Sequence, residues 1–270
     1  MVPENLGRYF YRDNLKSEQA KHLYNEILTY FTHNYSTEVP VTFENMDEAS
    51  QDIFCAAEAL YYDWPELFFI GNSWRFLYTK EKPGRFIIEG NRYSAEQVCM
   101  VRFHMKRVRD YLLKGTEEEP VLRREQIIYE RIAQLLRYDN RHERHDHTIV
   151  APILRCTGVC EGINALLLLA LRAAGIPAIK VIGCAKINGG GHAWAIAWPD
   201  LSTPVHLDAT WDLTSSVSPD IVWENHGERC AFRYFNLSDR QISQDHDGYR
   251  KDYMPRCQKE YLNYDKICNI

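Results

Sequence analysis

An apolar stretch at residues 160–174 is the feature that most constrains how this chain can fold. Only Glu161 and Arg172 are charged within it, and leucine occupies every position from 166 to 169. A helix that is apolar around most of its circumference is stable when nearly all of it is buried. The sequence therefore predicts a central helix at residues 160–174, with the rest of a domain packed around it.

A cysteine stands at the predicted start of this helix. Thr157 and Gly158 supply cap and turn residues before it, and Gly175 followed by Pro177 ends it. In the first turn of a helix, free backbone N–H groups and the positive end of the helix dipole favour a thiolate over a thiol. Cys160 is thus a candidate nucleophile, although a lone cysteine is more often an inert buried side chain.

Three short apolar segments after the helix predict consecutive antiparallel strands at residues 178–184, 192–198 and 203–208. A hairpin centred on Asp200 places His192 directly opposite Asp208, on the same face of the sheet. The carboxylate would then bind one imidazole nitrogen and leave the other for Cys160. A histidine in a strand is more often structural, so the prediction depends on all three residues together.

Four short stretches carry a resemblance to a known family. They are GVCEG at residues 158–162, LRAAGIPA at 171–178, HAW at 192–194 and LDATW at 207–211. Together they resemble the transglutaminase-like superfamily of papain-like thiol enzymes, and its bacterial members look closest. The resemblance implies that Cys160 is the nucleophile, His192 the base and Asp208 the group that orients the histidine.

The resemblance extends over about residues 120–245, because residues 234–239 and the pair Asp245-His246 are similar to the closing segment of the family. Ala195 departs from the asparagine that bacterial relatives often carry after His-Ala-Trp, a difference that concerns a local substrate contact. Nothing in the sequence resembles the calcium loops or the β-sandwich domains of animal transglutaminases. The resemblance implies an α+β fold with a papain-like or transglutaminase-like core, in which the nucleophile helix is buried against an antiparallel sheet.

The sequence before this core predicts an N-terminal α+β accessory region at residues 1–115, followed by the catalytic domain at 116–270. The boundary lies at Lys114-Gly115-Thr116. Apolar periodicity predicts helices at 14–31 and 46–62, and strands at 66–70, 74–79 and 85–89. Two capping boxes predict the helices on either side of the boundary: Ser94 with Gln97, and Thr116 with Glu119.

Composition and charge narrow the classes of partner. The net charge of −5 and pI near 6.1 argue against general nucleic-acid binding, and no long run of one charge sign marks a membrane-surface segment. Residues 1–15 lack the basic and apolar regions of a signal peptide. The eight cysteines form no Cys-x-x-Cys pair, which favours reduced thiols. We therefore expect a cytoplasmic protein that acts on a protein or peptide, with no nucleic acid or membrane as partner.

Two further features suggest weaker hypotheses. His142, His145 and His147 are spaced closely enough for a metal site, but their charged neighbours favour a solvated loop, so the prediction is no metal and no cofactor. Cys156 lies shortly before Cys160, and a disulfide between the two would block the nucleophile. An inert thiol is the favoured interpretation of Cys156.

The residues predict a cysteine enzyme that acts on amide or peptide bonds through a thioester acyl-enzyme. Water as the acceptor gives a peptidase or amidase, and a lysine amine gives a transglutaminase. Hydrolysis is slightly favoured, because nothing marks a site that excludes water. The alternative from another class is a catalytically silent scaffold or peptide-binding module that keeps the fold. Removal of asparagine-linked sugars, which some relatives perform, is a further enzymatic alternative.

Overall fold

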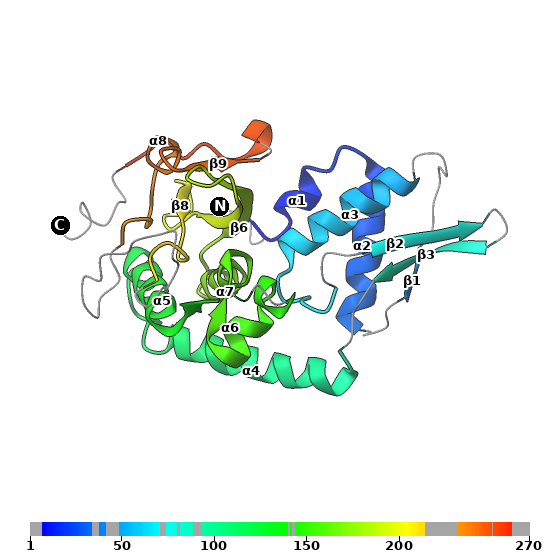
Figure 1. Cartoon of the computed structure of the whole chain (residues 1–270), viewed down its shortest axis with the longest axis horizontal. Coiled ribbons are helices and arrows are strands. Elements are labelled where there is room, and N and C mark those ends of the chain that lie inside the picture. The colour runs from blue at the N-terminus through cyan, green and yellow to red at the C-terminus, as the bar shows by residue number, and fades with distance from the viewer. Residues whose placement is uncertain are drawn as a thin grey trace. The chain divides into compact units, whose positions relative to one another are not determined.

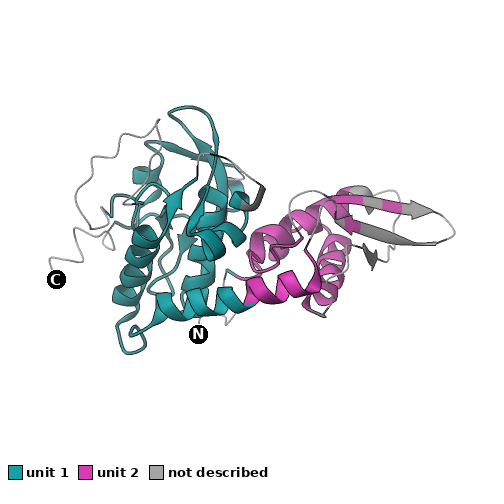
Figure 2. Ribbon diagram, turned by 60° about the horizontal axis from the view of Figure 1, so that its bottom comes forward, with its two compact units in different colours: residues 1–7, 103–270 teal, residues 8–102 magenta. Residues whose placement is uncertain are grey.

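The computed structural model describes residues 7–33, 38–41, 49–70, 74–79, 82–88, 93–139, 141, 144–213, 232–249 and 251–260. The chain divides into two compact units, one of residues 8–102 and one of residues 1–7 with 103–270 (Figure 2). Helix α4 (Ala95–Leu113) contributes to both units. A turn at Lys114 and Gly115 follows α4, and the domain boundary expected there stays a prediction.

The unit of residues 8–102 combines three helices with a three-stranded antiparallel sheet in the order β1-β3-β2. Its elements are α1 (Phe10–Asp13), α2 (Glu18–His33), β1 (Glu38–Val41), α3 (Ala49–Asp63), β2 (Trp74–Thr79) and β3 (Lys82–Ile88). Asp63 is fully buried and accepts hydrogen bonds from the backbone N–H groups of Tyr11 and Arg12 and from the Tyr24 hydroxyl. This carboxylate therefore links all three helices.

One strand predicted for this unit is wrong. Residues 66–70 form successive turns, in which Leu67 N–H donates to the Trp64 carbonyl and Ile70 N–H to the Leu67 carbonyl, both at 2.9 Å. The apolar side chains of this segment are buried although the backbone forms turns. A short apolar run of this kind has the same sequence pattern as a buried strand, which is why a strand was predicted. The strands β2 and β3 were predicted, and β1 was not.

The second unit is built around a four-stranded antiparallel sheet in the order β8-β7-β6-β9 (Figure 1). Its strands are β6 (Ala178–Ala185), β7 (Gly191–Ala197), β8 (Val205–Leu207) and β9 (His246–Gly248). Its helices are α5 (Val121–Leu135), α6 (Val150–Arg155), α7 (Cys160–Ala173) and α8 (Asp239–Ile242), with the 3-10 turns η1 (Arg144–His147) and η2 (Lys251–Tyr253). A parallel pair, β4 (Arg137–Tyr138) and β5 (Thr157–Gly158), leads into α7.

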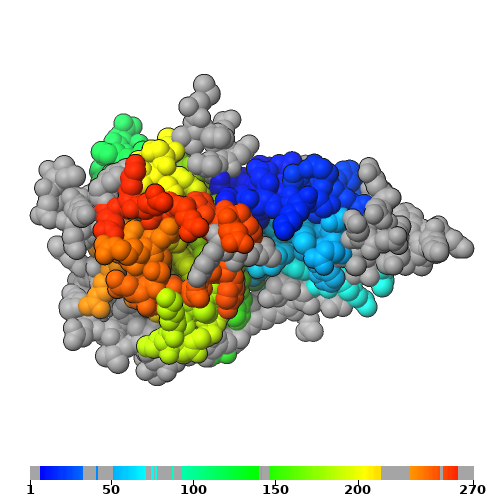
Figure 3. Space-filling view, turned by 90° about the horizontal axis from the view of Figure 1, so that it is seen from above, coloured from blue at the N-terminus to red at the C-terminus, as the bar shows by residue number. Residues whose placement is uncertain are grey.

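The C-terminal part of the chain completes this unit. β9 pairs with β6 at the edge of the sheet, and residues 232–260, orange to red in Figure 3, lie next to the yellow-green segment that contains the sheet. The sheet thus joins strands that are distant in the sequence. The fold is α+β, with a buried helix packed on an antiparallel sheet, as predicted.

Helix α7 confirms the prediction of a central helix. It begins at Cys160, buries residues 162–168 and packs against β6 and β7. Gly175 follows it with a φ of 77°, a conformation that costs glycine little, and so ends the helix. Neither α7 nor any other helix in the described ranges is long and apolar enough to cross a membrane.

Close packing explains why the second glycine of the GVCEG motif, Gly162, is a glycine. A Cβ atom at this position would lie 2.4 Å from the backbone oxygen of Asp146 and 2.7 Å from that of Thr148. Only glycine lets the segment around η1 approach the first turn of α7 this closely. The close approach fixes the loop that faces the start of the helix, beside Cys160.

The two capping boxes have different outcomes. Ser94 and Gln97 bond reciprocally, with N···O distances of 2.8 and 3.2 Å, and α4 begins directly after Ser94. The box at Thr116 is wrong: α5 begins at Val121, and the Thr116 hydroxyl donates to the Leu113 carbonyl. Pro120 moves the start of the helix downstream, because its fixed φ suits a helix start.

Glu125 on α5 is fully buried in the core, where its Oε2 accepts a hydrogen bond from Asn236. Burial raises the pKa of Glu125 from its ordinary 4.5 to about 8, although the bond from Asn236 opposes the rise. Below pH 4.5 the carboxyl is neutral in both the folded and the unfolded chain. Between pH 4.5 and 8 it ionises in the unfolded chain alone, so the stability present at low pH is lost across this window.

Glu125→Gln is therefore expected to stabilise the protein at pH 8 by a few kcal/mol relative to its effect at pH 4.5, since each unit of pKa difference corresponds to about 1.4 kcal/mol. Urea unfolding of both proteins at pH 5 and pH 8 measures this. Glu130→Gln, on the same helix, is the matched control for the loss of one carboxylate. Equal pH dependence in Glu125→Gln and wild type would contradict the prediction.

Candidate active site

The three residues predicted to form a triad come together in the second unit. Cys160 is the first residue of α7, His192 lies in β7, and Asp208 directly follows β8. His192 Nε2 lies 2.7 Å from Asp208 Oδ2, and the Cys160 thiol is close enough to the same imidazole to raise its pKa. His192 and Asp208 are buried, while Cys160 is partly exposed. The arrangement joins a thiol, an imidazole and a carboxylate in one line of contacts.

The predicted register between β7 and β8 is wrong by two residues. Leu207 pairs with Ala195 and His206 with Ile196, whereas the prediction places Leu207 opposite Ala193. The turn causes the difference, because Leu201 adopts a φ of 63° and donates to the Trp198 carbonyl.

A shift of two residues keeps every side chain on its predicted face, because side chains alternate along a strand. His192 and Asp208 are consequently diagonal rather than direct neighbours. Diagonal positions remain within reach of long side chains. The hydrogen bond of the predicted pair therefore forms in spite of the wrong register.

Charge and burial act against each other at His192. Burial alone would lower its pKa, but the Asp208 charge and hydrogen bond, together with Cys160, raise the pKa of His192 to about 10. Burial likewise opposes ionisation of Asp208, yet the contacts with His192 and His246 hold the pKa of Asp208 well below its usual range. An imidazolium is thus the favoured form of His192 at neutral pH. Since Nε2 faces Asp208, Nδ1 is the nitrogen left for Cys160.

Aromatic rings surround the imidazole. The Trp194 ring is stacked on His192 at 5.9 Å between centroids, and the Trp211 ring lies at 5.5 Å. Both tryptophans are buried. These rings restrict the orientation of His192 and keep water from its bond with Asp208.

Part of the sequence is similar to a known family. Residues 109–209 match the sequence profile of the transglutaminase-like superfamily, a stretch that contains Cys160, His192 and Asp208. This stretch is similar to a transglutaminase-like core. The search among curated proteins found no match.

Two solved structures resemble the chain at low identity. The crystal structure of a TGase shares 12% identity and a TM-score of 0.39, and the match covers 52% of this chain and 44% of that one. A candidate cysteine protease from Cytophaga hutchinsonii shares 18% identity and a TM-score of 0.35, with 47% and 51% covered. The chain thus spans about half the length of each structure.

The second unit holds two residues of the site that sequence reasoning missed. Tyr138 of β4 is coupled electrostatically to the site: burial, and then the charges of Cys160 and Asp208, raise the pKa of Tyr138 to about 12. His246 of β9 binds the same Asp208 oxygen as His192, at 3.0 Å. The only signal for His246 was its place in the closing segment of the family, and no spacing rule pointed to Tyr138.

An ion-pair network lies beside the thiol. Glu161, next to Cys160 in the chain, contacts the Lys180 ammonium at 2.7 Å and His147 Nδ1 at 3.3 Å. The hydrogen bond to Glu161 raises the pKa of His147, against the effect of burial. His142 and the side chain of His145 lie outside the described residues, so the histidine cluster of this loop stays untested.

Two side-chain groups in the described part of the core are close enough to share a metal ion: His192, Asp208 and His246, and His206, Asp239 and Cys257. Hydrogen bonds account for the closeness in each. In the second group Trp194 Nε1 donates to His206 Nδ1, so the His206 proton is on Nε2 and is donated to Asp239. A metal would require that nitrogen without its proton, and we assign no metal to either group.

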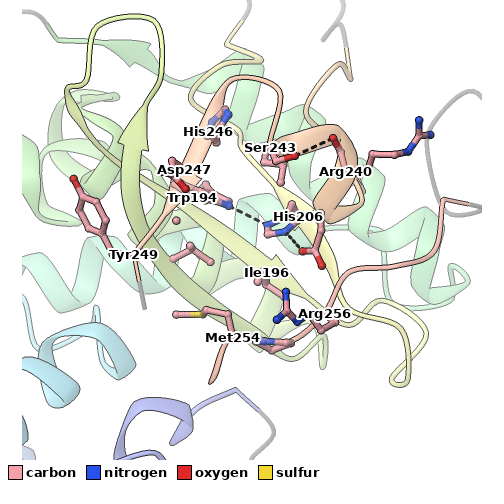
Figure 4. Close-up of a pocket in the computed structure, with 15 residues that line it drawn as sticks. Trp194, Ile196, His206, Arg240, Ser243, His246, Asp247, Tyr249, Met254 and Arg256 are labelled. Carbon is pink, nitrogen blue, oxygen red and sulfur yellow. Dashed lines mark hydrogen bonds and ion pairs between the residues drawn. The ribbon is translucent and has the colours of Figure 1, made fainter. Parts of the chain in front are cut away.

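A cavity of about 350 Å³ lies on the sheet beside the C-terminal segment (Figure 4). Its lining includes Trp194, Ile196, His206, His246, Tyr249 and Met254. Figure 4 shows the bonds that join Trp194, His206 and Asp239 at its wall. Trp194 and His246 belong both to this wall and to the surroundings of His192.

Cys156 occupies the left-handed position that ends α6, with a φ of 54°. Its carbonyl accepts a hydrogen bond from Arg137 N–H, which starts the pairing of β4 with β5. Cys156 and Cys160 are both free thiols. The favoured interpretation of Cys156 as an inert thiol, and the alternative of a disulfide with Cys160, both stay untested.

Proposed function

We propose that this chain is a transglutaminase-like cysteine enzyme that acts on amide or peptide bonds of a protein or peptide, with hydrolysis favoured over transfer to an amine. The observation that carries the proposal is the position of His192, which is hydrogen-bonded to Asp208 and whose pKa is raised by both Asp208 and Cys160. Cys160 is the nucleophile, His192 the acid and base, and Asp208 the orienting group.

The first half of the reaction forms the acyl-enzyme. In the resting pair His192 Nδ1 already holds the proton of Cys160, and the thiolate attacks the carbonyl carbon of the substrate. The tetrahedral intermediate collapses as His192 returns the proton to the departing amine, which leaves a thioester on Cys160. Asp208 stabilises the imidazolium throughout, since its carboxylate lies 2.7 Å from Nε2.

The second half consumes the thioester. His192 takes a proton from an incoming water, the hydroxyl attacks the thioester carbon, and the carboxylic acid leaves as the Cys160 thiolate and the His192 imidazolium are restored. A lysine amine in place of water would give transamidation through the same steps. We expect hydrolysis, and we expect a protein or peptide substrate in the cytoplasm, without nucleic acid or membrane as partner.

The negative oxygen of the intermediate needs hydrogen-bond donors. The backbone N–H of Cys160 is one, because the first N–H groups of a helix have no partner within it. We assign the second to the hydroxyl of Tyr138, on the basis of its electrostatic coupling to Cys160.

Tyr138→Phe is expected to lower kcat on the order of 100-fold, the typical effect of removing one such donor, and to leave the alkylation rate of Cys160 nearly unchanged. Steady-state kinetics and iodoacetamide labelling of the same preparation separate the two effects. An equal loss in both measurements would assign Tyr138 to the thiol rather than to the intermediate. Unchanged kcat would remove it from the mechanism.

Incubation with casein and a fluorescent primary amine tests the proposed reaction directly. New peptide fragments, or ammonia released without incorporation of the amine, mean hydrolysis, and fluorescence incorporated into casein means transamidation. Cys160→Ala is the control for both signals. No product of either kind, from a protein whose Cys160 also shows no acyl adduct with a peptide ester, would favour a catalytically silent scaffold.

A further inference from the structure

Asp208 has a second histidine partner that the proposed mechanism does not use. His246 Nε2 lies 3.0 Å from Asp208 Oδ2, the oxygen that also binds His192. The other oxygen, Oδ1, accepts from the backbone N–H of Thr210. This buried carboxylate thus accepts three hydrogen bonds, and His246 supplies one of the donors.

The other nitrogen of His246 also faces a carboxylate. His246 Nδ1 lies 2.5 Å from Asp245 Oδ1, and Asp245 Oδ2 accepts a hydrogen bond from the Tyr234 hydroxyl at 2.6 Å. A neutral imidazole has one donor and one acceptor nitrogen, and an acceptor cannot lie this close to a carboxylate oxygen. With both carboxylates ionised, both nitrogens of His246 are donors, which makes the ring an imidazolium.

The surroundings of His246 fit a buried cation. The rings of Trp211, Trp194 and Tyr234 lie at centroid distances of 4.4, 5.0 and 5.6 Å from it. Aromatic rings at such distances attract a positive charge. Burial would lower the pKa of His246, but the hydrogen bonds to Asp208 and Asp245 raise it.

We propose that His246 is a positioning residue: as an imidazolium between Asp208 and Asp245, it holds the Asp208 carboxylate toward His192 and makes Cys160 lose its proton more readily. The inference rests on the proposed function. His246 touches neither the thiol nor the substrate in this role, and acts through Asp208.

The effect on the thiol follows from charge. The His246 ring lies 5.1 Å from the His192 ring, so its positive charge favours loss of a proton from nearby groups. The charged or titratable groups that face His246 are Asp208 after β8, Asp245 before β9, His192 of β7, Tyr234 and, through Trp194, His206. The two carboxylates keep the cation in place, and Asp208 keeps His192 protonated in spite of the neighbouring charge.

His246→Gln removes this charge and keeps a side chain that can bond to Asp208. We expect the pH midpoint for alkylation of Cys160 by iodoacetamide to rise by about half a unit to one unit, the order that a unit charge produces at this range. His22→Gln, which removes an exposed histidine from α2, is the matched control and should leave the midpoint unchanged. A purely structural role would lower the melting temperature without moving the midpoint.

An unchanged or lowered midpoint in folded His246→Gln would overturn the inference, while a reactive wild-type Cys160 in the same experiment would leave the proposed function standing. If wild-type Cys160 titrates as an ordinary thiol, the proposed function fails and the inference fails with it. Should the variant not fold, nitrogen NMR of wild-type protein labelled at histidine decides. Two protonated ring nitrogens on His246 at pH 7 support the inference, and one protonated nitrogen overturns it.

Discussion

Replacing Cys160 with serine is expected to lower kcat/KM for an amide substrate at least about a thousandfold, as removal of a nucleophile from a coupled triad does. A serine hydroxyl holds its proton far more tightly than a thiol, and His192 is poised to accept from sulfur. The change exchanges one atom at the partly exposed start of α7, so the buried part of the helix is untouched. Kinetics and thermal melting of the variant measure both expectations.

Cys156→Ser is the matched control for this substitution. The residue precedes Cys160 closely in the chain, but its structural contact is made through its backbone carbonyl. In the presence of a reductant, activity should remain near that of the wild type. Retained activity in Cys160→Ser, or equal loss in both variants, would show that the thiol of Cys160 is not the nucleophile.

Asp208→Asn is expected to lower kcat/KM on the order of 100-fold or more, because it reverses the proton position on His192. In the wild type, one Asp208 oxygen accepts from both His192 and His246, and the other from Thr210 N–H. Asparagine has a single oxygen for these three donors. If that oxygen stays with Thr210, the amide N–H₂ meets His192 Nε2, which must then give up its proton.

The proton of His192 would move to Nδ1, so this nitrogen could no longer accept from Cys160. Without the Asp208 charge, the effect of burial on His192 would no longer be opposed. The pKa of His192 would therefore fall from about 10 to below its ordinary 6.5. The pH profile of kcat/KM should therefore change as well as its height. A wild-type pH profile with only a small loss of rate would assign Asp208 a structural role alone.

The parts of the site that sequence could predict depend on local chemistry. The apolar circumference of residues 160–174 required a buried helix, and Gly175 with Pro177 required its end, so the position of Cys160 at the helix start followed. The pairing of His192 with Asp208 was reached through a wrong register. It held because a shift by two residues preserves the face on which a side chain lies.

The parts that sequence missed depend on contacts between distant segments. β9 joins β6 across an interval of the chain that no local pattern spans, and with it comes His246. Tyr138 reaches the site because β4 pairs in parallel with β5, just before Cys160. Even the local capping rule failed at Thr116, where Pro120 supplied a stronger helix start. Local propensity is a weak guide wherever packing or a neighbouring residue offers another arrangement.

The most direct test of the proposed triad is labelling of the native protein with iodoacetamide at pH 6, followed by mass spectrometry of each cysteine. We expect Cys160 to be alkylated well ahead of the other seven cysteines, and His192→Ala to slow it to their rate, because the imidazolium is what keeps the thiolate charged. Equal labelling of all eight cysteines in the wild type, with no change in His192→Ala, would contradict a catalytic triad of Cys160, His192 and Asp208.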